Sequence, residues 1–371
     1  MSNRILLLSS RADHGGGPRH IELLIKELYQ NFEFHVACPE EVPYWSRYQK
    51  LVENRMVRIP HRQLSLSSLR SLLQYVSYNS IDFIHSHGKG AGFYAKIIKS
   101  FTRKKWLHTP HGIHVDQYSL LTKKTYSFYE NFFMANPDKV IFVSEEEMKK
   151  AKLEKIWVDV PFNVVPNGVS IISIENHNSL RSKGRELLGL GEKDKVIVTL
   201  SRFDYQKNMR EALIIAKRLP NIKFIWIGDG PEKGILNDEI KNINIKNIII
   251  IDFCNNSLPY LGAGDIYLST SRWEGLPLSI IEAMSLGIPI VASDVIGHKN
   301  LVKKTQSGIL YTLGNYSEAI KAIQKLLYDK SFYNFTRNSA INNQKLYFSD
   351  KLMGEKILNI YNEILKSHPS G

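Results

Sequence analysis

The segment AGDIYLSTSRWEGLPLSIIEAM, residues 263–284, contains the pattern that decides the fold. Residues 265–270 have an apolar centre and predict a strand, and a second apolar run begins after Pro277. Because proline disfavours helical backbone at the preceding residue, we expect a helix to begin near Leu278. Glu274 then lies on a loop after the strand, whereas Glu282 lies within the helix. Strand, loop and helix in this order form the repeating unit of a parallel α/β sheet.

The same alternation extends from this segment in both directions. Further strands are predicted at 4–9, 33–38, 82–85, 105–109, 139–143, 161–165, 195–200, 223–228, 247–252, 288–293 and 308–311. The turn signal Val165-Pro166-Asn167-Gly168 and a polar stretch that reaches about Leu190 interrupt the series. We therefore predict an α/β fold with two doubly wound, Rossmann-like domains that face a central cleft, followed by C-terminal helices.

The interruption sets the expected boundaries. We expect a first domain at 1–170, a linker at 171–192 and a second domain at 193–345. A C-terminal helix at 346–371 could pack back on the first domain. Ligands of such sheets bind at the carboxyl ends of the strands, so the loops that follow the strands are the places to search for a site.

Composition excludes several classes of protein. The 371 residues are 43% apolar and 23% charged, which is typical of a globular chain and not of a disordered or collagen-like one. No apolar run approaches the ~18 residues that a membrane-spanning helix needs. The two cysteines, Cys38 and Cys254, fit a reducing compartment, so we expect a cytoplasmic protein.

The net charge of +13 is concentrated in one part of the chain. Residues 42–111 contain twelve Lys or Arg and two acids, Glu53 and Asp82. Such a stretch is either a solvated basic face or a surface for an anionic membrane, a phosphorylated acceptor or nucleic acid. Nucleic acid is the least favoured partner, because no nucleic-acid-binding motif accompanies the charge. We expect peripheral contact with an anionic membrane. An aromatic-rich stretch at 118–133 follows; half of its face is expected to pack in the core as a helix, and the remainder could meet a lipid acceptor or the bilayer interface.

Two loops have residues suited to phosphate. The sequence His14-Gly15-Gly16-Gly17-Pro18 follows the first strand and opens a helix, where unpaired backbone N–H groups can bind an anion. By itself this pattern is equally that of a plain turn.

The second loop follows the first strand of the second domain. Arg202 and Lys207 both lie on it and can converge on a diphosphate, although two surface cations would look the same. Glu282 is a suitable acceptor for paired sugar hydroxyls, and its apolar neighbours argue against the alternative of a fully exposed helix acid.

Together these motifs resemble the retaining glycosyltransferases of family 4, which have the GT-B fold. The resemblance rests on Glu274 and Glu282 with the strand before them, on Arg202 with Lys207, and on His20 in the early glycine loop. Three further motifs occur in the family's order: His108-Thr109-Pro110-His111-Gly112, Val165-Pro166-Asn167-Gly168 and Gly228-Asp229-Gly230-Pro231. It covers nearly the whole chain and is specific for the family, not for the substrate.

The resemblance implies a role for each matching residue. Gly16 and Gly17 would lie near the donor phosphate and the reacting centre, and His111 would contact the donor sugar. The loop at Phe253 and Cys254 would lie beside the nucleobase.

In the second domain, Arg202 and Lys207 would neutralise the diphosphate leaving group. Glu274, with the backbone of Gly275 and Leu276, would hold the donor sugar.

The helix that opens at Leu278 would offer its N–H groups to phosphate, and Glu282 would bind the ribose hydroxyls. Two departures affect these contacts. Asn208 stands where the family often has Gly, and residues 297–300 lack an acid that the family often has.

The resemblance implies a metal-independent hexosyltransferase. It would transfer a hexose or N-acetylhexosamine from a nucleotide sugar, with UDP favoured and no cofactor, and retain the configuration. The acceptor would be a lipid-linked glycan of lipopolysaccharide, O-antigen or capsule biosynthesis at the inner face of the plasma membrane. The alternatives are a GT-B nucleotide-sugar epimerase and a non-catalytic protein that binds nucleotide sugars or polyanions.

Histidine and acidic side chains can bind a metal ion, so a metal site is another hypothesis. His108, His111 and His114 are three residues apart, but Pro110 and Gly112 prevent a helix that would align them, so we expect no metal. His85 and His87 are two apart and should share one face of a strand. Ser144 followed by the acids at 145–147 predicts a helix N-terminus, where the helix dipole would favour the three negative charges.

Overall fold

The computed structural model describes residues 2–113, 122, 125, 136–157 and 159–366. The chain forms two compact units. Unit 1 contains Met1–Gly168 and Asp350–Gly371, and unit 2 contains Val169–Ser349. The aromatic stretch at 118–133 lies outside the described residues, apart from Thr122 and Thr125. Across the described ranges, no helix is both long enough and apolar enough to cross a bilayer.

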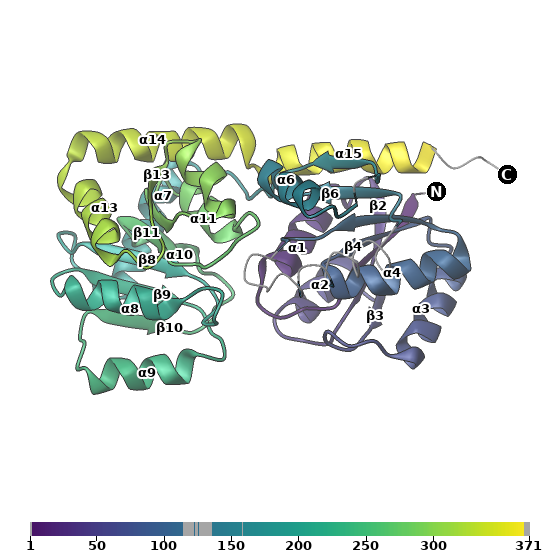
Figure 1. Ribbon diagram of the computed structural model, residues 1–371, viewed down its shortest axis with the longest axis horizontal. Helices are drawn as coiled ribbons and strands as arrows, with labels where there is room; N and C mark the ends of the chain where they lie inside the picture. The colour runs from purple at the N-terminus through teal and green to yellow at the C-terminus, as the bar shows by residue number, and fades with distance from the viewer. Residues whose placement is uncertain (1, 114–121, 123–124, 126–135, 158, 367–371) are drawn as a thin grey trace. The chain divides into compact units, whose positions relative to one another are not determined.

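Unit 1 is built on a parallel sheet of seven strands in the order β3-β2-β1-β4-β5-β6-β7 (Figure 1). The strands are β1 Asn3–Ser9, β2 Phe32–Cys38, β3 Met56–Arg58, β4 Phe83–His87, β5 Lys105–Thr109, β6 Lys139–Phe142 and β7 Phe162–Val164. Leu8 of β1 lies opposite Ala37 of β2 and Ser86 of β4. The chain order reverses beside β1, which places a topological switch point between β1 and β4.

Helices cover both faces of this sheet. They are α1 Gly16–Leu28, α2 Tyr44–Val52, α3 Leu66–Tyr78, α4 Lys89–Thr102, α6 Glu145–Leu153 and α15 Asp350–Lys366. On one face, Leu72 of α3 and Tyr94 of α4 pack into a core with Ile84 of β4. On the other face, Phe83 contacts Tyr361 of α15, with ring centroids 4.9 Å apart. Successive strand residues point to opposite faces, so β4 anchors both layers.

Unit 2 repeats this plan with six parallel strands in the order β10-β9-β8-β11-β12-β13. The strands are β8 Val196–Leu200, β9 Lys223–Ile227, β10 Ile248–Ile251, β11 Ile266–Ser269, β12 Ile290–Ser293 and β13 Gly308–Tyr311. The four inner strands β9, β8, β11 and β12 are apolar runs buried on both faces, whereas the edge strands β10 and β13 are mostly half-buried. The switch point lies between β8 and β11.

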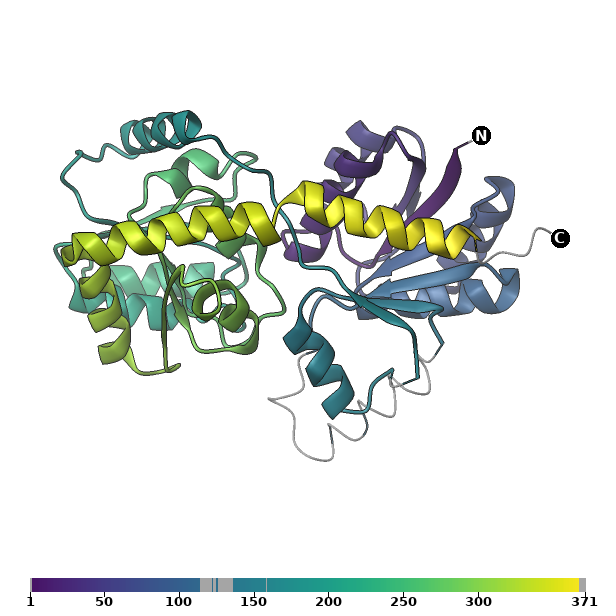
Figure 2. The ribbon, with the colours of Figure 1, turned by 90° about the horizontal axis from the view of Figure 1, so that it is seen from above.

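Helices flank this second sheet as well, as Figure 2 shows from above. They are α7 Ile174–Leu187, α8 Met209–Arg218, α9 Lys233–Asn242, α10 Leu258–Gly262, α11 Leu278–Ser285, α12 Ile296–His298, α13 Tyr316–Tyr328 and α14 Lys330–Tyr347, with a π-helical turn at Lys299–Lys303. The main core joins Phe203, Trp226 and Leu268 to helices α8 and α13.

The structure confirms the expected α/β fold and departs from the sequence prediction in two elements. Strand β3 was not predicted, because its three residues are half-buried or exposed and lack an apolar run. The stretch expected to be a linker at 171–192 contains helix α7. Arg181 of α7 donates to the carbonyl oxygens of Ala263 and Gly264 and pairs with Asp265 at 2.6 Å. This helix is polar and held by such contacts, so it has no apolar stripe that the sequence could reveal.

Candidate functional site

Lys207 and Glu274 form an ion pair at the switch point of unit 2, in which Glu274 is buried and Lys207 is half-buried. Lys207 lies on the loop after β8, Glu274 lies on the loop after β11, and the Lys207 Nζ is 2.5 Å from the Glu274 Oε1. Ser271 Oγ donates to the same oxygen at 2.7 Å. Burial alone would raise the pKa of Glu274, but the charge of Lys207, with help from His298 and Ser271, lowers it below the ordinary value. Glu274 is therefore a carboxylate at neutral pH.

Arg202 lies on the same loop as Lys207. Its guanidinium is 2.8 Å from the carboxylate of Asp204 and donates to Gln206 Oε1 at 3.3 Å. The shape of the loop depends on Gly228 after β9, which has φ of +146°. A Cβ atom at Gly228 would lie 1.9 Å from the carbonyl oxygen of Ser201, so only glycine allows the two loops to approach this closely.

Asn208 stands where the family pattern often has glycine, and it adopts the backbone conformation that the loop requires at this position. Its backbone is left-handed, with φ of 54° and ψ of 47°, a conformation that asparagine tolerates better than most residues except glycine. Its amide donates to Glu211 at 2.7 Å and accepts from Arg272 at 2.8 Å. Thr270 Oγ1 donates to the carbonyl oxygens of Lys207 and Asn208, both at 3.0 Å, and so ties the two strand-end loops together.

Helix α11 begins at Leu278, directly after Pro277, as the sequence predicts. Gly275 and Leu276 precede it on the loop, and Leu276 and Leu278 are both buried. Glu282 is half-buried within the helix, so it is not the fully exposed acid that the alternative required. The N–H groups of the first helical turn are suited to an anion.

The 296–300 segment contains two residues that sequence reasoning missed. His298 is fully buried and donates through Nδ1 to the carbonyl oxygen of Ser293 at 2.7 Å, which leaves Nε2 to accept from Ser269 Oγ at 3.2 Å. Burial lowers the pKa of His298, although Glu274 opposes this effect. At Gly297, a Cβ atom would lie 2.6 Å from the Cβ of Glu274. Small size at 297 therefore lets this segment close over Glu274.

Phe253 and Cys254 lie on the loop after β10, two strands away from β8 in the sheet. Both are half-buried. They remain predicted contacts of the nucleobase.

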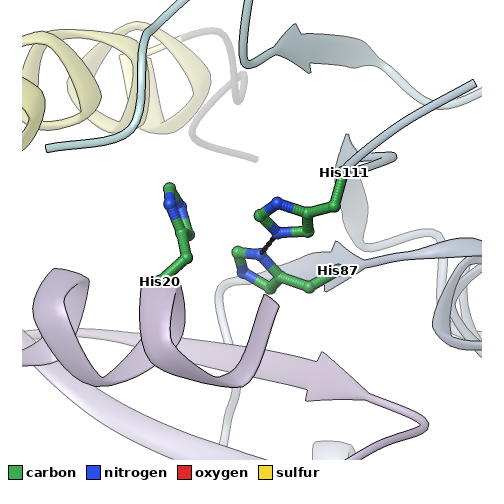
Figure 3. A group of neighbouring side chains, drawn as sticks. All are labelled: His20, His87 and His111. Carbon is green, nitrogen blue, oxygen red and sulfur yellow. Dashed lines mark hydrogen bonds between the residues drawn. The ribbon is translucent and has the colours of Figure 1, made fainter. Parts of the chain in front are cut away.

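In unit 1, three histidines lie together near the switch point between β1 and β4 (Figure 3). His20 comes from α1, His87 is the last residue of β4, and His111 follows β5. His87 Nδ1 and His111 Nε2 are hydrogen-bonded at 3.1 Å. Gly17 lies beside them, because a Cβ atom there would be 3.6 Å from the Cδ2 of His111, whereas Gly16 has open space.

Burial keeps these imidazoles neutral. It lowers the pKa of His20 to about 4, against an opposing hydrogen bond to Asn167. It lowers the pKa of His87 and of His111 well below the ordinary value, and neighbouring histidines act in the same direction. His111 also has a left-handed backbone, with φ of 58°, a conformation that histidine tolerates better than most residues except glycine.

His85 and His87 lie on one face of β4, as predicted, with ring centroids 4.1 Å apart. His85 is held between Tyr361 at 2.6 Å and Thr109 at 2.8 Å, and His108 is bonded to Ser86 at 2.8 Å. His114 lies outside the described residues.

Glu147 corrects the interpretation of the acidic run at 145–147. The predicted cap exists, because Ser144 Oγ accepts from the Glu147 N–H at 3.1 Å. The Glu147 side chain, however, is buried and accepts from the N–H groups of Gly112 and Val143. It therefore fixes the loop that follows His111 and is not merely a charge at the helix start. No local sequence pattern indicates this contact between distant segments.

Two family models match the chain. The model described as Glycosyltransferase Family 4 matches residues 14–171, and the model described as Glycosyl transferases group 1 matches residues 181–346. Between them they leave only the ends of the chain and a short gap unmatched.

Individual relatives agree with the two models. The chain is 28% identical to an Escherichia coli UDP-Gal:alpha-D-GlcNAc-diphosphoundecaprenol alpha-1,3-galactosyltransferase, with 87% of each chain covered. It is 26% identical to a Klebsiella pneumoniae protein of the cps region, over 94% of this chain and 96% of that one. The structure of Anabaena HepE with UDP and glucose superposes with a TM-score of 0.83 at 18% identity, covering 96% and 99% of the two chains. The chain therefore belongs to glycosyltransferase family 4, and its fold is GT-B.

Proposed function

We propose that this glycosyltransferase is a retaining hexosyltransferase that uses a UDP-sugar donor and a lipid-linked glycan acceptor in the synthesis of a bacterial surface polysaccharide. The E. coli relative is named for UDP-galactose and an undecaprenyl diphosphate acceptor, and the K. pneumoniae relative is encoded in a cps region. HepE, which shares the fold, has been crystallised with UDP. These names support the UDP donor, the lipid-linked acceptor and a role in O-antigen or capsule synthesis.

The Lys207–Glu274 pair is the observation that carries the proposal. When the bond between sugar and diphosphate breaks, negative charge grows on the leaving oxygen, and a fixed cation stabilises that charge. Glu274 holds the Lys207 ammonium at the switch point, and that ammonium has further N–H donors for phosphate oxygens. Arg202, on the same loop, would add a second cation. These cations would do the work that a metal ion does in other transferases, so we propose metal-independent catalysis.

Helix α11 would bind the rest of the nucleotide. Its first turn begins at Leu278, shortly after Glu274 in the chain, and would offer N–H groups to the diphosphate. Glu282 would accept hydrogen bonds from the ribose hydroxyls, and Phe253 and Cys254 would lie beside the base. The backbone of Gly275 and Leu276 would help Glu274 to hold the donor sugar.

Unit 1 would bind the acceptor and supply His111 to the donor sugar. The neutral imidazole can donate or accept a hydrogen bond without bringing a positive charge to the sugar. Gly17 beside it would leave room for the reacting groups, and Gly16 would lie near the donor phosphate. We place the reaction at the cytoplasmic face of the plasma membrane, where a lipid-linked acceptor would meet a nucleotide sugar.

A transfer assay tests the proposal. The full chain is incubated with a synthetic N-acetylglucosaminyl diphosphate lipid and, in turn, with UDP-linked glucose, galactose and their N-acetylated forms. Mass spectrometry should detect one added hexose or N-acetylhexosamine with one of these donors. Proton NMR of the product should show the anomeric configuration of the donor. Lys207→Ala should abolish most of the product, whereas Lys217→Ala, an exposed lysine on α8, should leave it unchanged.

The assay also separates the alternative functions. An epimerase would convert the UDP-sugar without needing an acceptor, and a binding protein would hold the donor without releasing UDP. Inverted configuration in the product would contradict the retaining mechanism while leaving the transferase assignment in place.

A further inference from the structure

The three histidines of unit 1 form a compact set of nitrogen ligands. One ring nitrogen from each of His20, His87 and His111 lies within 4.8 Å of the others (Figure 3). His20 is 1% exposed and His87 is 3% exposed, whereas His111 is half-buried, so His111 is the member of the set that reaches solvent. This trio is not the set His108, His111 and His114, whose members are three residues apart in the sequence. Its three rings come from α1, from β4 and from the loop after β5.

The contact of His20 with Asn167 determines which nitrogen faces the set. His20 Nδ1 is 3.0 Å from Asn167 Oδ1, and a carbonyl oxygen can only accept, so Nδ1 carries the proton. The other nitrogen, Nε2, is then a bare lone pair. It is buried and has no hydrogen-bond partner among the described residues, and the same is true of His87 Nε2. Buried polar atoms without partners are rare and costly, so the bare His20 Nε2 favours a ligand at this position; His87 faces the set with Nδ1, the nitrogen that is bonded to His111.

Three imidazole nitrogens without a nearby thiolate are a donor set for Zn²⁺ and related ions such as Co²⁺ and Ni²⁺. Magnesium and calcium prefer oxygen ligands and would not be held. Two nitrogens bound to one Zn²⁺ can be at most about 4 Å apart, so small rotations of the rings bring all three within reach. An ion would take the place of the proton that now lies between His87 Nδ1 and His111 Nε2. That proton would move to the second nitrogen of the imidazole that carries it.

We propose that His20, His87 and His111 form a binding site for a single Zn²⁺-type ion, with Asn167 fixing the His20 ring. The hydrogen bond from His20 to an oxygen acceptor is the usual arrangement around histidines that bind metals. Three protein ligands leave a fourth coordination position for water or a substrate oxygen.

The site has a consequence for catalysis that rests on the proposed function. If His111 contacts the donor sugar, an ion that binds His111 removes it from that contact. Zn²⁺ should therefore inhibit transfer, and a chelator should leave the transferase active or increase its activity. The proposed site is thus regulatory and is compatible with metal-independent catalysis.

Binding is tested directly, without any donor or acceptor. The full chain, free of a polyhistidine tag, is titrated with ZnCl₂ by calorimetry and with CoCl₂ by visible absorption. We expect one ion per chain and the intense d–d bands of four-coordinate Co²⁺. His20→Gln, His87→Gln and His111→Gln should each remove the site. Asn167→Ala should weaken the affinity about 10- to 100-fold, since it removes the group that orients His20.

Matched controls distinguish this site from other zinc ligands. His61→Gln changes a histidine of the same unit that contacts Glu41 instead, and Cys254→Ser removes the half-buried thiol. Neither change should affect the one-ion binding. The proposal is overturned if wild-type protein binds no Zn²⁺, if Mg²⁺ competes for the site, or if the Co²⁺ spectrum is that of a six-coordinate ion. These wild-type results do not depend on whether the variants fold or on whether the chain transfers sugar.

Discussion

At the scale of single residues, the buried carboxylate of Glu274 determines where unit 2 holds the cation that would meet the donor diphosphate. A buried carboxylate is expensive to leave without a partner, and Glu274 is buried while Lys207 is half-buried. Lys207 therefore stays fixed with or without a ligand, and the leaving diphosphate meets a cation that needs no rearrangement. Glu282 has a different environment, half-buried within α11, which suits binding more than catalysis.

We expect Glu282→Ala to weaken the binding of UDP. Losing one charged acceptor for the ribose hydroxyls should cost about 1.5–3 kcal/mol of binding free energy. Calorimetry with UDP measures this loss. Glu186→Ala, which changes an exposed acid of α7, is the matched control and should leave the affinity unchanged. Unchanged affinity in a folded Glu282→Ala protein would remove the ribose assignment.

Gly297→Ala tests the packing of the 296–300 segment on Glu274. The added methyl group would lie 2.6 Å from the Glu274 Cβ and 2.7 Å from its carbonyl carbon, so one of the two segments has to move. Overpacking of this kind costs about 1–3 kcal/mol of unfolding free energy. It should also lower the turnover of transfer, because Glu274 moves.

Gly234→Ala in α9 is the control for this substitution. A Cβ atom there would meet nothing within 4 Å, so stability should be equal or slightly higher. Urea unfolding and the transfer assay, applied to both variants, give the comparison. Wild-type turnover in Gly297→Ala would show that Glu274 does not depend on this contact.

At the scale of elements, α6 holds the loop after β5 through one side chain. Burial raises the pKa of Glu147 from its ordinary 4.5 to about 7, although the N–H groups of Val143 and Gly112 oppose this. Between those values the folded chain keeps a proton that the unfolded chain has released. The free energy of unfolding should therefore fall as pH rises from about 4.5 to about 7, by roughly 3 kcal/mol, and stay constant above that.

Glu147→Gln should remove this slope. Urea midpoints at about pH 5 and about pH 8 should differ less in the variant than in the wild type. Glu145→Gln, an exposed acid in the same helical turn, should keep the wild-type difference. A wild-type slope that survives in Glu147→Gln would assign the titration to another group.

The elements also show what the sequence could and could not predict. The start of α11 was predictable, because Pro277 restricts the local backbone regardless of the rest of the fold. The strands other than β3 were predictable because buried parallel strands are nearly continuous apolar runs. Helix α7 was not, since its contacts are hydrogen bonds from arginines to distant carbonyl groups. The sequence did not predict the contacts of His20 with Asn167, of Glu147 with Gly112 or of His298 with Ser269 for a similar reason. Each joins residues that lie far apart in the chain or in different elements.

At the scale of the whole molecule, part of the basic stretch at 42–111 is neutralised by acids outside it. Arg47 is 3.4 Å from Glu22, Arg58 is 3.1 Å from Glu40, and Asp138 pairs with Lys99 at 2.8 Å. Lys105 pairs with Asp138 as well. The excess of ten positive charges within 42–111, from twelve Lys or Arg and two acids, therefore overstates the charge available to a membrane. Arg103, at the end of α4, is exposed and lies next to Phe101 and Thr102 in the chain, and Phe101 is 74% exposed.

We still propose peripheral binding to anionic membranes and expect it to depend on this end of α4. Each basic residue near an anionic surface contributes ~1 kcal/mol, so changing Arg103 and Lys104 to Ser should weaken vesicle binding roughly 30-fold. Flotation with vesicles of phosphatidylglycerol measures this, and added salt should reduce binding. Lys193→Ser with Lys195→Ser, an equal charge change on exposed lysines of unit 2, is the control. Absence of wild-type flotation at low salt would end the membrane proposal alone.

We propose that fixed cations, and not a metal ion, stabilise the departing diphosphate. The measurement is the turnover number of Lys207→Ala at saturating UDP-sugar, with donor affinity measured separately and EDTA present throughout. We expect turnover to fall by more than the loss of donor affinity, because the charge on the leaving group grows towards the transition state. We also expect EDTA to leave wild-type turnover intact. Wild-type turnover in Lys207→Ala, or a strict requirement for a divalent ion, would contradict it.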